Sequence, residues 1–176
     1  MKTMAIIDRI KEYFFVNPTA KLRVRQIERE IKVPLPSAIR YAKELEKQGI
    51  LKSTIVAGVK LYSADRTSKT FLIEKKLFNI KSLFSSGLVE FLVNKYSNAA
   101  IAVFGSYAKG EDIEKSDIDL YIEMQKKEIN LERFEKELKR KIQLFIYKKI
   151  TDVENKELAN NILNGITLNG FIEVYR

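Results

Sequence analysis

Apolar residues recur at helical spacing in three segments near the start of the chain. The first segment ends at Asn17-Pro18, Pro34 and Pro36 mark the start of the third, and Gly49 follows it, as Pro and Gly commonly do at helix boundaries. Beyond Gly49, two apolar strand-like pieces flank Ala57-Gly58, a pair typical of a hairpin turn. The pattern predicts, in chain order, a helix over 4–16, an extended piece over 21–23, helices over 24–31 and from 34 to about 48, and strands over 50–56 and 59–63.

The third of these helices has one face that is expected to pack against a core. Its apolar stripe consists of Ile39, Ala42 and Leu45, which recur at the three- and four-residue spacing of a single helix face. The positions that would then face outward are Ser37, Arg40, Tyr41 and Glu44.

The second half of the chain alternates between helix-like and strand-like patterns. After a polar joint at 66–69, helices are expected over 70–77 and 87–96, which we interpret as linker and packing elements. Dimerisation is the alternative role for the first of them. Further along, the pattern predicts strands over 99–104, 117–123 and 142–148, helices over 131–140 and 155–164, and an apolar tail over 165–174 that packs against the sheet. These elements predict a small mixed α/β sheet with helices on one side.

Positive charge is concentrated at the start of the chain. The 176 residues carry a net charge of +9. Residues 1–66 hold 14 Lys or Arg against 7 Asp or Glu, whereas residues 67–176 hold 18 against 16. This asymmetry favours a nucleic-acid-binding module joined to a second module of nearly balanced charge.

Composition excludes several classes of chemistry. The chain contains no Cys and no His, which excludes disulfides, thiolate or histidine zinc sites, and catalysis by a Cys nucleophile or a His base. Charged residues interrupt the apolar positions near the start of the chain, unlike a signal peptide, and no apolar run approaches the roughly 18 residues of a membrane span. We therefore expect a cytoplasmic protein without a membrane partner, whose chemistry uses carboxylates, Lys, Tyr, Ser or a hard metal ion.

The strongest chemical signal follows the expected strand over 99–104. This strand ends at Gly105-Ser106, where the backbone can turn sharply and present N–H groups to a phosphate. Ten residues later, Asp117 and Asp119 begin another strand, and the two-residue period places both carboxylates on one face. Two adjacent carboxylates repel each other unless a cation lies between them, and Mg²⁺ takes one or two carboxylates together with substrate phosphates. The stretch therefore predicts a metal–nucleotide site.

The same stretch resembles the signature of the polymerase-beta-like nucleotidyltransferase superfamily, and the short surrounding domain looks most like the minimal nucleotidyltransferases. The resemblance implies that Gly105 and Ser106 form the phosphate-binding turn and that Asp117 and Asp119 are the first two metal ligands. Lys109 would add positive charge beside a phosphate. The implied cofactors are Mg²⁺ or Mn²⁺, with ATP or another nucleoside triphosphate as substrate or ligand.

The third carboxylate of that superfamily is missing from its expected place. It should lie on the neighbouring strand, but alternation over 142–148 gives that position to Gln143. A neutral carboxamide binds Mg²⁺ more weakly than a carboxylate and cannot accept a proton from an attacking hydroxyl near neutral pH. The alternative candidates for the third carboxylate are Glu123, further along the strand of Asp117 and Asp119, and Asp152, in a later loop. Whether catalysis is retained is therefore open.

Residues 1–65 resemble a winged helix-turn-helix domain in their order of helices and hairpin. The stretches Arg25-Gln-Ile-Glu-Arg-Glu-Ile and Leu45-Glu-Lys-Gln-Gly-Ile-Leu-Lys are similar to those of many small prokaryotic regulators. In such domains the third helix enters the DNA major groove and the hairpin lies along the phosphate backbone. The DNA-binding residues that this resemblance implies are Arg25, Ser37, Arg40, Tyr41, Lys52 and Lys60. The alternatives are simple solvated charges and a module that binds protein.

The sequence thus predicts an α+β protein with a winged helix-turn-helix domain at 1–65, a helical linker at 66–97 and a minimal nucleotidyltransferase-like domain at 98–176. The leading hypothesis is a regulator that binds double-stranded DNA and carries a domain for nucleoside triphosphate and Mg²⁺, with transfer of a nucleoside monophosphate to a hydroxyl as its expected reaction. One alternative is an antitoxin-type protein adenylyltransferase acting on a HEPN-type toxin. Another is an inactive domain that mediates protein contacts. A homodimer is a further expectation.

Overall fold

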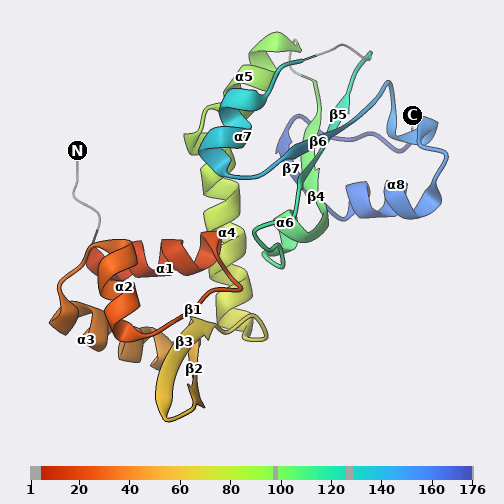
Figure 1. The fold of residues 1–176 in the computed structure, drawn as a ribbon. Coiled ribbons are helices and arrows are strands. Elements are labelled where there is room, and N and C mark those ends of the chain that lie inside the picture. The colour runs from red at the N-terminus through yellow and green to blue at the C-terminus, as the bar shows by residue number, and fades with distance from the viewer. Residues whose placement is uncertain (1–4, 97–98, 126–128, 176) are drawn as a thin grey trace. The chain divides into compact units, whose positions relative to one another are not determined.

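The computed structural model describes residues 5–96, 99–125 and 129–175. Contacts divide the chain into two compact units, Met1–Phe78 and Asn79–Arg176, which are treated separately below (Figure 1). One helix, α4 (Lys69–Ser85), contributes its first part to one unit and its last part to the other. None of the helices in the described residues combines the length and apolar character that crossing a membrane requires.

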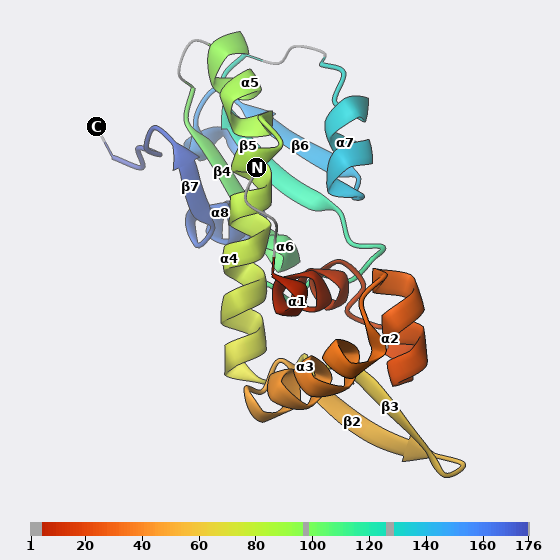
Figure 2. The ribbon, with the colours of Figure 1, turned by 90° about the vertical axis from the view of Figure 1, so that its left-hand side faces the viewer.

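The N-terminal unit contains three helices and a small antiparallel sheet. Its elements are α1 (Ile6–Val16), β1 (Lys21–Leu22), α2 (Val24–Ile31), α3 (Leu35–Lys47), β2 (Leu51–Val56) and β3 (Val59–Ala64). The strand order is β1-β3-β2, and β2 and β3 form a hairpin that extends away from the helices of this unit (Figure 2). Ala57 and Gly58, at φ 47° and 75°, form the tight turn that the sequence predicts. The winged helix-turn-helix interpretation of this arrangement stays a prediction.

The buried face of α3 differs from the predicted one by a single position. Ala38, Ala42 and Leu45 are fully buried, whereas Ile39 is 40% exposed. Alanine at the first two positions allows α3 to pack closely against α1 and α2, which a branched side chain would prevent. Tyr41, predicted to face outward, is half-buried and packs against the core of the unit.

Helix α4 is longer than the sequence predicts. We expected a helix over 70–77 with Leu83 and Phe84 beyond it, but a single helix runs from Lys69 to Ser85. No Gly or Pro interrupts this range, and Gly87, at φ 73°, is the first residue that leaves helical geometry decisively. The expected linker is therefore in part a continuous helix whose side chains enter the cores of both units.

The C-terminal unit is built on a four-stranded sheet of order β6-β5-β4-β7. Beyond α4 its elements are α5 (Leu88–Lys95), β4 (Ile101–Phe104), α6 (Gly105–Lys109), β5 (Ile118–Glu123), α7 (Glu132–Leu138), β6 (Ile142–Tyr147), the 3₁₀ helix η1 (Ile150–Asp152), α8 (Lys156–Leu163) and β7 (Ile166–Asn169). Strand β4 is antiparallel to β5 and β7, and β5 is parallel to β6. The first part of the apolar tail that was expected to pack against the sheet is instead its edge strand, β7.

Helices cover both faces of this sheet, which corrects the prediction of helices on one side (Figure 1). Val103 and Leu120 face one core, together with residues of α5 and α7. Phe104 and Tyr121 face the other, where Ile162 of α8 packs against them. On both faces of the sheet, the side chains of β4 and β5 are thus apolar except for Asp119 and Glu123. A strand with two apolar faces must be covered on both.

Candidate functional site

The turn between β4 and α6 lies directly against the carboxylate of Asp119. Phe104, the last residue of β4, pairs with Asp119 of β5. Gly105 follows with φ +70°, and a Cβ atom on it would lie less than 3.0 Å from Oδ2 of Asp119. Any larger residue would therefore suffer both backbone strain and a collision with the carboxylate. Glycine is required here because the backbone and the carboxylate must approach closely.

Asp117 and Asp119 influence each other electrostatically. Asp119 is half-buried, and burial, followed by the negative charge of Asp117, raises its pKa above the usual value of 3.8. Asp117 is exposed and immediately precedes β5. A raised pKa means that the ionised pair is unfavourable without a counter-charge. A divalent cation held by both carboxylates would supply that charge, so the residues present fit the predicted metal site.

The strand pairing places Gln143 beside Asp119. Strands β5 and β6 are parallel, with Asp119 and Gln143 as register partners. The side chain of Gln143 is exposed. The tertiary structure therefore puts a neutral amide where the superfamily resemblance implies a third carboxylate.

Neither alternative acid completes the site in the described part of the chain. Glu123 accepts a hydrogen bond from the Tyr121 hydroxyl at 3.1 Å, and Asp152 accepts one from the Lys149 backbone N–H at 3.2 Å. Both charges act on the Tyr121 phenol, whose pKa is raised mainly by burial. No cluster of three or more acidic residues arranged to hold a metal is found in the described residues. In the described residues, Asp117 and Asp119 are therefore the carboxylates left for the predicted metal site.

The remaining predicted nucleotide ligands lie on α6. Ser106 is half-buried, and its carbonyl oxygen accepts a hydrogen bond from the Glu111 N–H at 2.9 Å. Lys109, the last residue of α6, is exposed. A pocket of about 440 Å³ adjoins Asp117 and is lined in part by Lys115, Lys136, Lys139 and Lys141. A larger pocket, about 870 Å³, lies along β6 and α7 and includes none of the predicted site residues, whereas the smaller one includes Asp117 but not the other predicted site residues.

Four of the predicted DNA contacts lie on α2 and α3. Arg25 and Arg40 are exposed, and Ser37 is half-buried. The Arg40 guanidinium stacks on the Tyr41 ring at 4.4 Å and donates a hydrogen bond to its hydroxyl. This stacking links two of the predicted contacts into one unit.

The two predicted contacts on the hairpin already have acidic partners. Lys52 Nζ lies 3.7 Å from Asp65, and Lys60 Nζ lies 3.0 Å from Glu46. The hydrogen bond to Glu46 is the main cause that raises the pKa of Lys60. The Ser53 hydroxyl, which donates to the same carboxylate, is the main cause that lowers the pKa of Glu46. These lysines are less available to DNA phosphates than the sequence indicates.

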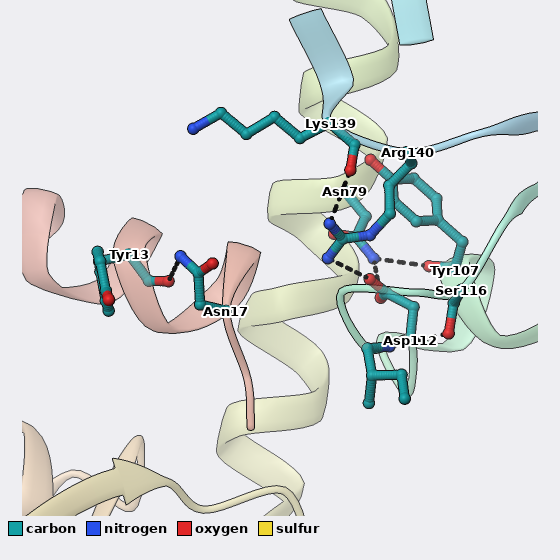
Figure 3. Close-up of polar contacts among 9 residues, drawn as sticks. Tyr13, Asn17, Asn79, Tyr107, Asp112, Ser116, Lys139 and Arg140 are labelled. Atoms are coloured by element: carbon teal, nitrogen blue, oxygen red, sulfur yellow. Dashed lines mark hydrogen bonds and ion pairs between the residues drawn. The ribbon is translucent and has the colours of Figure 1, made fainter. Parts of the chain in front are cut away.

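Sequence reasoning missed a buried polar cluster next to the turn. Asn79, Asp112 and Arg140 are exposed by only 2%, 1% and 7%, and they are joined by a hydrogen bond and an ion pair (Figure 3). Asp112 lies in the loop between the Gly105-Ser106 turn and Asp117. In the sequence it is one of several charged residues in a polar loop, and local pattern gives no sign that it is buried.

Comparison with known proteins supports a family for this part of the chain. Residues 85–167 match the nucleotidyltransferase domain family. The match includes the Gly105-Ser106 turn, both aspartates and Gln143. This part of the chain is thus similar to nucleotidyltransferase domains, which agrees with the resemblance inferred from Gly105 to Asp119.

A curated relative points in the same direction. A protein of Methanocaldococcus jannaschii named "Putative protein adenylyltransferase" is 48% identical over 46 residues, which are 26% of this chain and 47% of the relative. The chain therefore matches about half the length of that protein. No solved structure matches this chain significantly.

Proposed function

We propose that the nucleotidyltransferase domain binds a nucleoside triphosphate with Mg²⁺ or Mn²⁺ and transfers a nucleoside monophosphate to a hydroxyl group. The observation that carries the proposal is the close approach of the Gly105 backbone to the Asp119 carboxylate. At this point the backbone of Gly105, which has no room for a side chain, lies next to a pair of carboxylates whose negative charge a cation would balance. Phosphate and metal would meet at that place.

Each residue has a distinct role in this proposal. Asp117 and Asp119 would hold the divalent ion, which when bound supplies positive charge to the phosphates and polarises the reacting phosphoryl group. The backbone of Gly105-Ser106 would orient the triphosphate, and Lys109 would add charge beside it. Gln143 would position a ligand or water by hydrogen bonding, because its amide cannot take the proton of the attacking hydroxyl.

The nucleotide and the acceptor follow from the relative. A protein whose name describes adenylyl transfer to protein favours ATP as the donor and a protein hydroxyl as the acceptor. An acceptor of this kind fits the antitoxin-type hypothesis, in which the acceptor is a HEPN-type toxin. The inactive alternative, a domain that only binds protein, is favoured by Gln143 alone.

The decisive experiment uses ATP labelled on the α-phosphate. The full chain, Mg²⁺ and a cell extract are incubated, and transfer is read as label on protein; we expect labelling that Asp117→Asn reduces by at least tenfold. Gln143→Asp restores a third carboxylate and should increase labelling, while Gln143→Leu serves as its control. Absence of label with wild type and with Gln143→Asp, despite ATP binding by calorimetry, would contradict transfer.

We propose further that the N-terminal unit binds double-stranded DNA. The supporting observations are the surplus of positive charge in residues 1–66 and the exposed Arg25 and Arg40 beside a projecting hairpin. Regulators that read palindromic sites are usually dimers, and a homodimer remains a prediction for this chain. Helix α4 offers a surface for one, since its Ile73, Leu77 and Phe84 are 59%, 64% and 51% exposed.

DNA binding is tested by mobility shift with the DNA upstream of the chain's own coding sequence. Affinity should fall steeply as salt rises, because each phosphate contact releases condensed counterions. Sedimentation of the same complexes gives the number of chains per duplex. An absent shift, or one that salt does not change, would contradict the DNA-binding proposal and favour a protein-binding role for this unit.

A further inference from the structure

We infer that Asp112 and Arg140 are positioning residues of the metal–nucleotide site. Their buried ion pair sets the path of the loop that joins the Gly105-Ser106 turn to Asp117. This inference rests on the proposed binding of a nucleoside triphosphate and adds two residues that the superfamily resemblance does not assign.

The contacts join three separate segments of the C-terminal unit. Arg140 Nη2 lies 3.4 Å from Asp112 Oδ2, and Arg140 Nη1 donates to the Lys139 carbonyl at 3.0 Å. The amide of Asn79, on α4, donates to Asp112 Oδ1 at 2.7 Å and to the Tyr107 carbonyl at 2.9 Å. Figure 3 shows these side chains converging from α4, the loop after α6 and the segment before β6. One buried cluster thus holds α6, the loop and the start of β6 together.

These segments lead directly to the site residues. The loop around Asp112 begins where the Glu111 N–H donates to the Ser106 carbonyl at 2.9 Å. It ends at Asp117, just before the Ile118 N–H donates to the Lys141 carbonyl at 2.8 Å. Arg140 is the residue immediately before Lys141, whose carbonyl accepts this hydrogen bond. Displacement of the ion pair would therefore shift the phosphate turn and the first aspartate relative to each other.

Stability alone is a weak reason for this arrangement. Burying an ion pair removes two charges from water, and replacing such a pair by apolar residues of similar volume is often neutral or stabilising, whereas removing one partner is strongly destabilising. The Asp112–Arg140 ion pair is directional, and the Asn79 amide also binds Asp112, so together they fix the loop in one conformation. An apolar contact does this less well.

The double variant Asp112→Leu/Arg140→Met separates the two roles. It removes both charges together, so that neither member of the pair is left as an unpaired buried charge. Arg140→Lys is the conservative variant, because it keeps the charge and loses only the planar guanidinium. Lys11→Gln is the matched control, since it removes the cation from a 2.8 Å ion pair with Glu74 that includes none of the proposed site residues.

The experiment measures ATP binding by calorimetry in the presence of Mg²⁺, with the full-length chain well below its Tm, together with thermal unfolding of each variant. We expect the double variant to fold and to bind Mg·ATP at least tenfold more weakly. Arg140→Lys should recover part of that loss, and Lys11→Gln should bind within twofold of wild type. Hydrogen exchange should be faster at residues 105–117 in the double variant than in the control.

The outcomes are distinguishable. Wild-type affinity in a folded double variant, with unchanged exchange at 105–117, would overturn the positioning role while leaving the proposed function intact. If the double variant does not fold, Arg140→Lys decides, because wild-type affinity there together with unchanged exchange at 105–117 would likewise overturn the inference. Failure of the wild type itself to bind Mg·ATP would overturn the proposed function and this inference with it.

Discussion

At the scale of single residues, Gly105 and Asp119 depend on each other. The glycine is needed both for its positive φ and because the carboxylate occupies the space that a Cβ atom would take. Gly87 has nearly the same φ of +73°, but a Cβ atom on it would meet nothing within 4 Å, so it is a matched reference. Substituting each glycine in turn therefore separates the effect of backbone strain from the effect of displacing the Asp119 carboxylate.

We predict that Gly105→Ala abolishes Mg·ATP binding, whereas Gly87→Ala leaves it within about twofold. Both substitutions place Ala in the left-handed region, which costs on the order of 1–2 kcal/mol, so both should lower Tm. Only Gly105→Ala also pushes the Asp119 carboxylate away from the turn. Calorimetry at a temperature where both variants are folded decides the question, and equal affinities for the two would contradict it.

The carboxylate pair gives a second prediction, on stability and pH. The pKa of Asp119 is raised in the folded chain by burial and by Asp117, so the folded state holds the proton more tightly than the unfolded chain and ionisation costs stability. That cost is present at neutral pH and disappears as the pH falls below 3.8, the usual pKa. Removing the charge should therefore stabilise the metal-free protein near neutral pH only.

Asp119→Asn should accordingly raise Tm in EDTA at pH 7, because it removes the charge whose burial is unfavourable. The gain should shrink as the pH is lowered toward 3.8. Asp117→Asn relieves only the repulsion and should give a smaller gain. Thermal unfolding across this pH range provides the measurement, and a lower Tm for Asp119→Asn at pH 7 would count against it.

At the scale of elements, the hairpin and α2 differ in how freely their cations can bind DNA. Lys60 is held by Glu46 at 3.0 Å, whereas Arg25 is exposed on α2. A cation that must leave an acidic partner gains less from a phosphate than one already facing solvent. The predicted DNA contacts are therefore unequal, although the sequence treats them alike.

We predict that Arg25→Ala weakens DNA binding and lowers the salt slope of log K by about 0.9 for the lost phosphate contact. Lys60→Ala should have a smaller effect, and Glu46→Gln should strengthen binding by releasing Lys60. Lys156→Ala, which removes an exposed cation of the C-terminal unit, is the control. Mobility shifts at several salt concentrations test the order, which would be contradicted if Lys60→Ala had the larger effect.

Element boundaries were predictable where local chemistry marks them. Helix α2 has its predicted bounds, and the Ala57-Gly58 turn lies where the sequence places it. The length of α4 was not predictable, because residues between the expected end at 77 and Ser85 include polar side chains that interrupt the apolar period. Asn79 is one of them, and it is buried only because Asp112 and the Tyr107 carbonyl accept its amide hydrogens.

At the scale of the whole molecule, the chain consists of two units, each with its own buried core. The surplus of positive charge belongs to the first 66 residues, and the carboxylate turn belongs to the second unit. Ligands for the two proposed functions should therefore protect different parts of the chain.

Hydrogen exchange of the full chain provides the test at this scale. Mg·ATP should slow exchange within 79–176, most strongly at 105–119. The free energy of opening should rise by at most RT ln(1 + [L]/Kd), the stabilisation that binding adds, which is about 2.7 kcal/mol at a hundredfold excess over Kd. A DNA duplex should slow exchange within 1–78 instead. Protection of residues 1–78 by Mg·ATP alone would contradict this division.

The sequence by itself predicted the order of the N-terminal elements, the end of β4 before Gly105 and the place of Gln143 beside Asp119, because each depends on spacing along a short stretch of chain. Only the tertiary structure decided that Ala38 rather than Ile39 faces the core and that helices cover both sheet faces. It alone also buried Asp112 with Arg140. The physical reason is that burial and strand pairing depend on contacts between residues far apart in the chain, which local periodicity does not record.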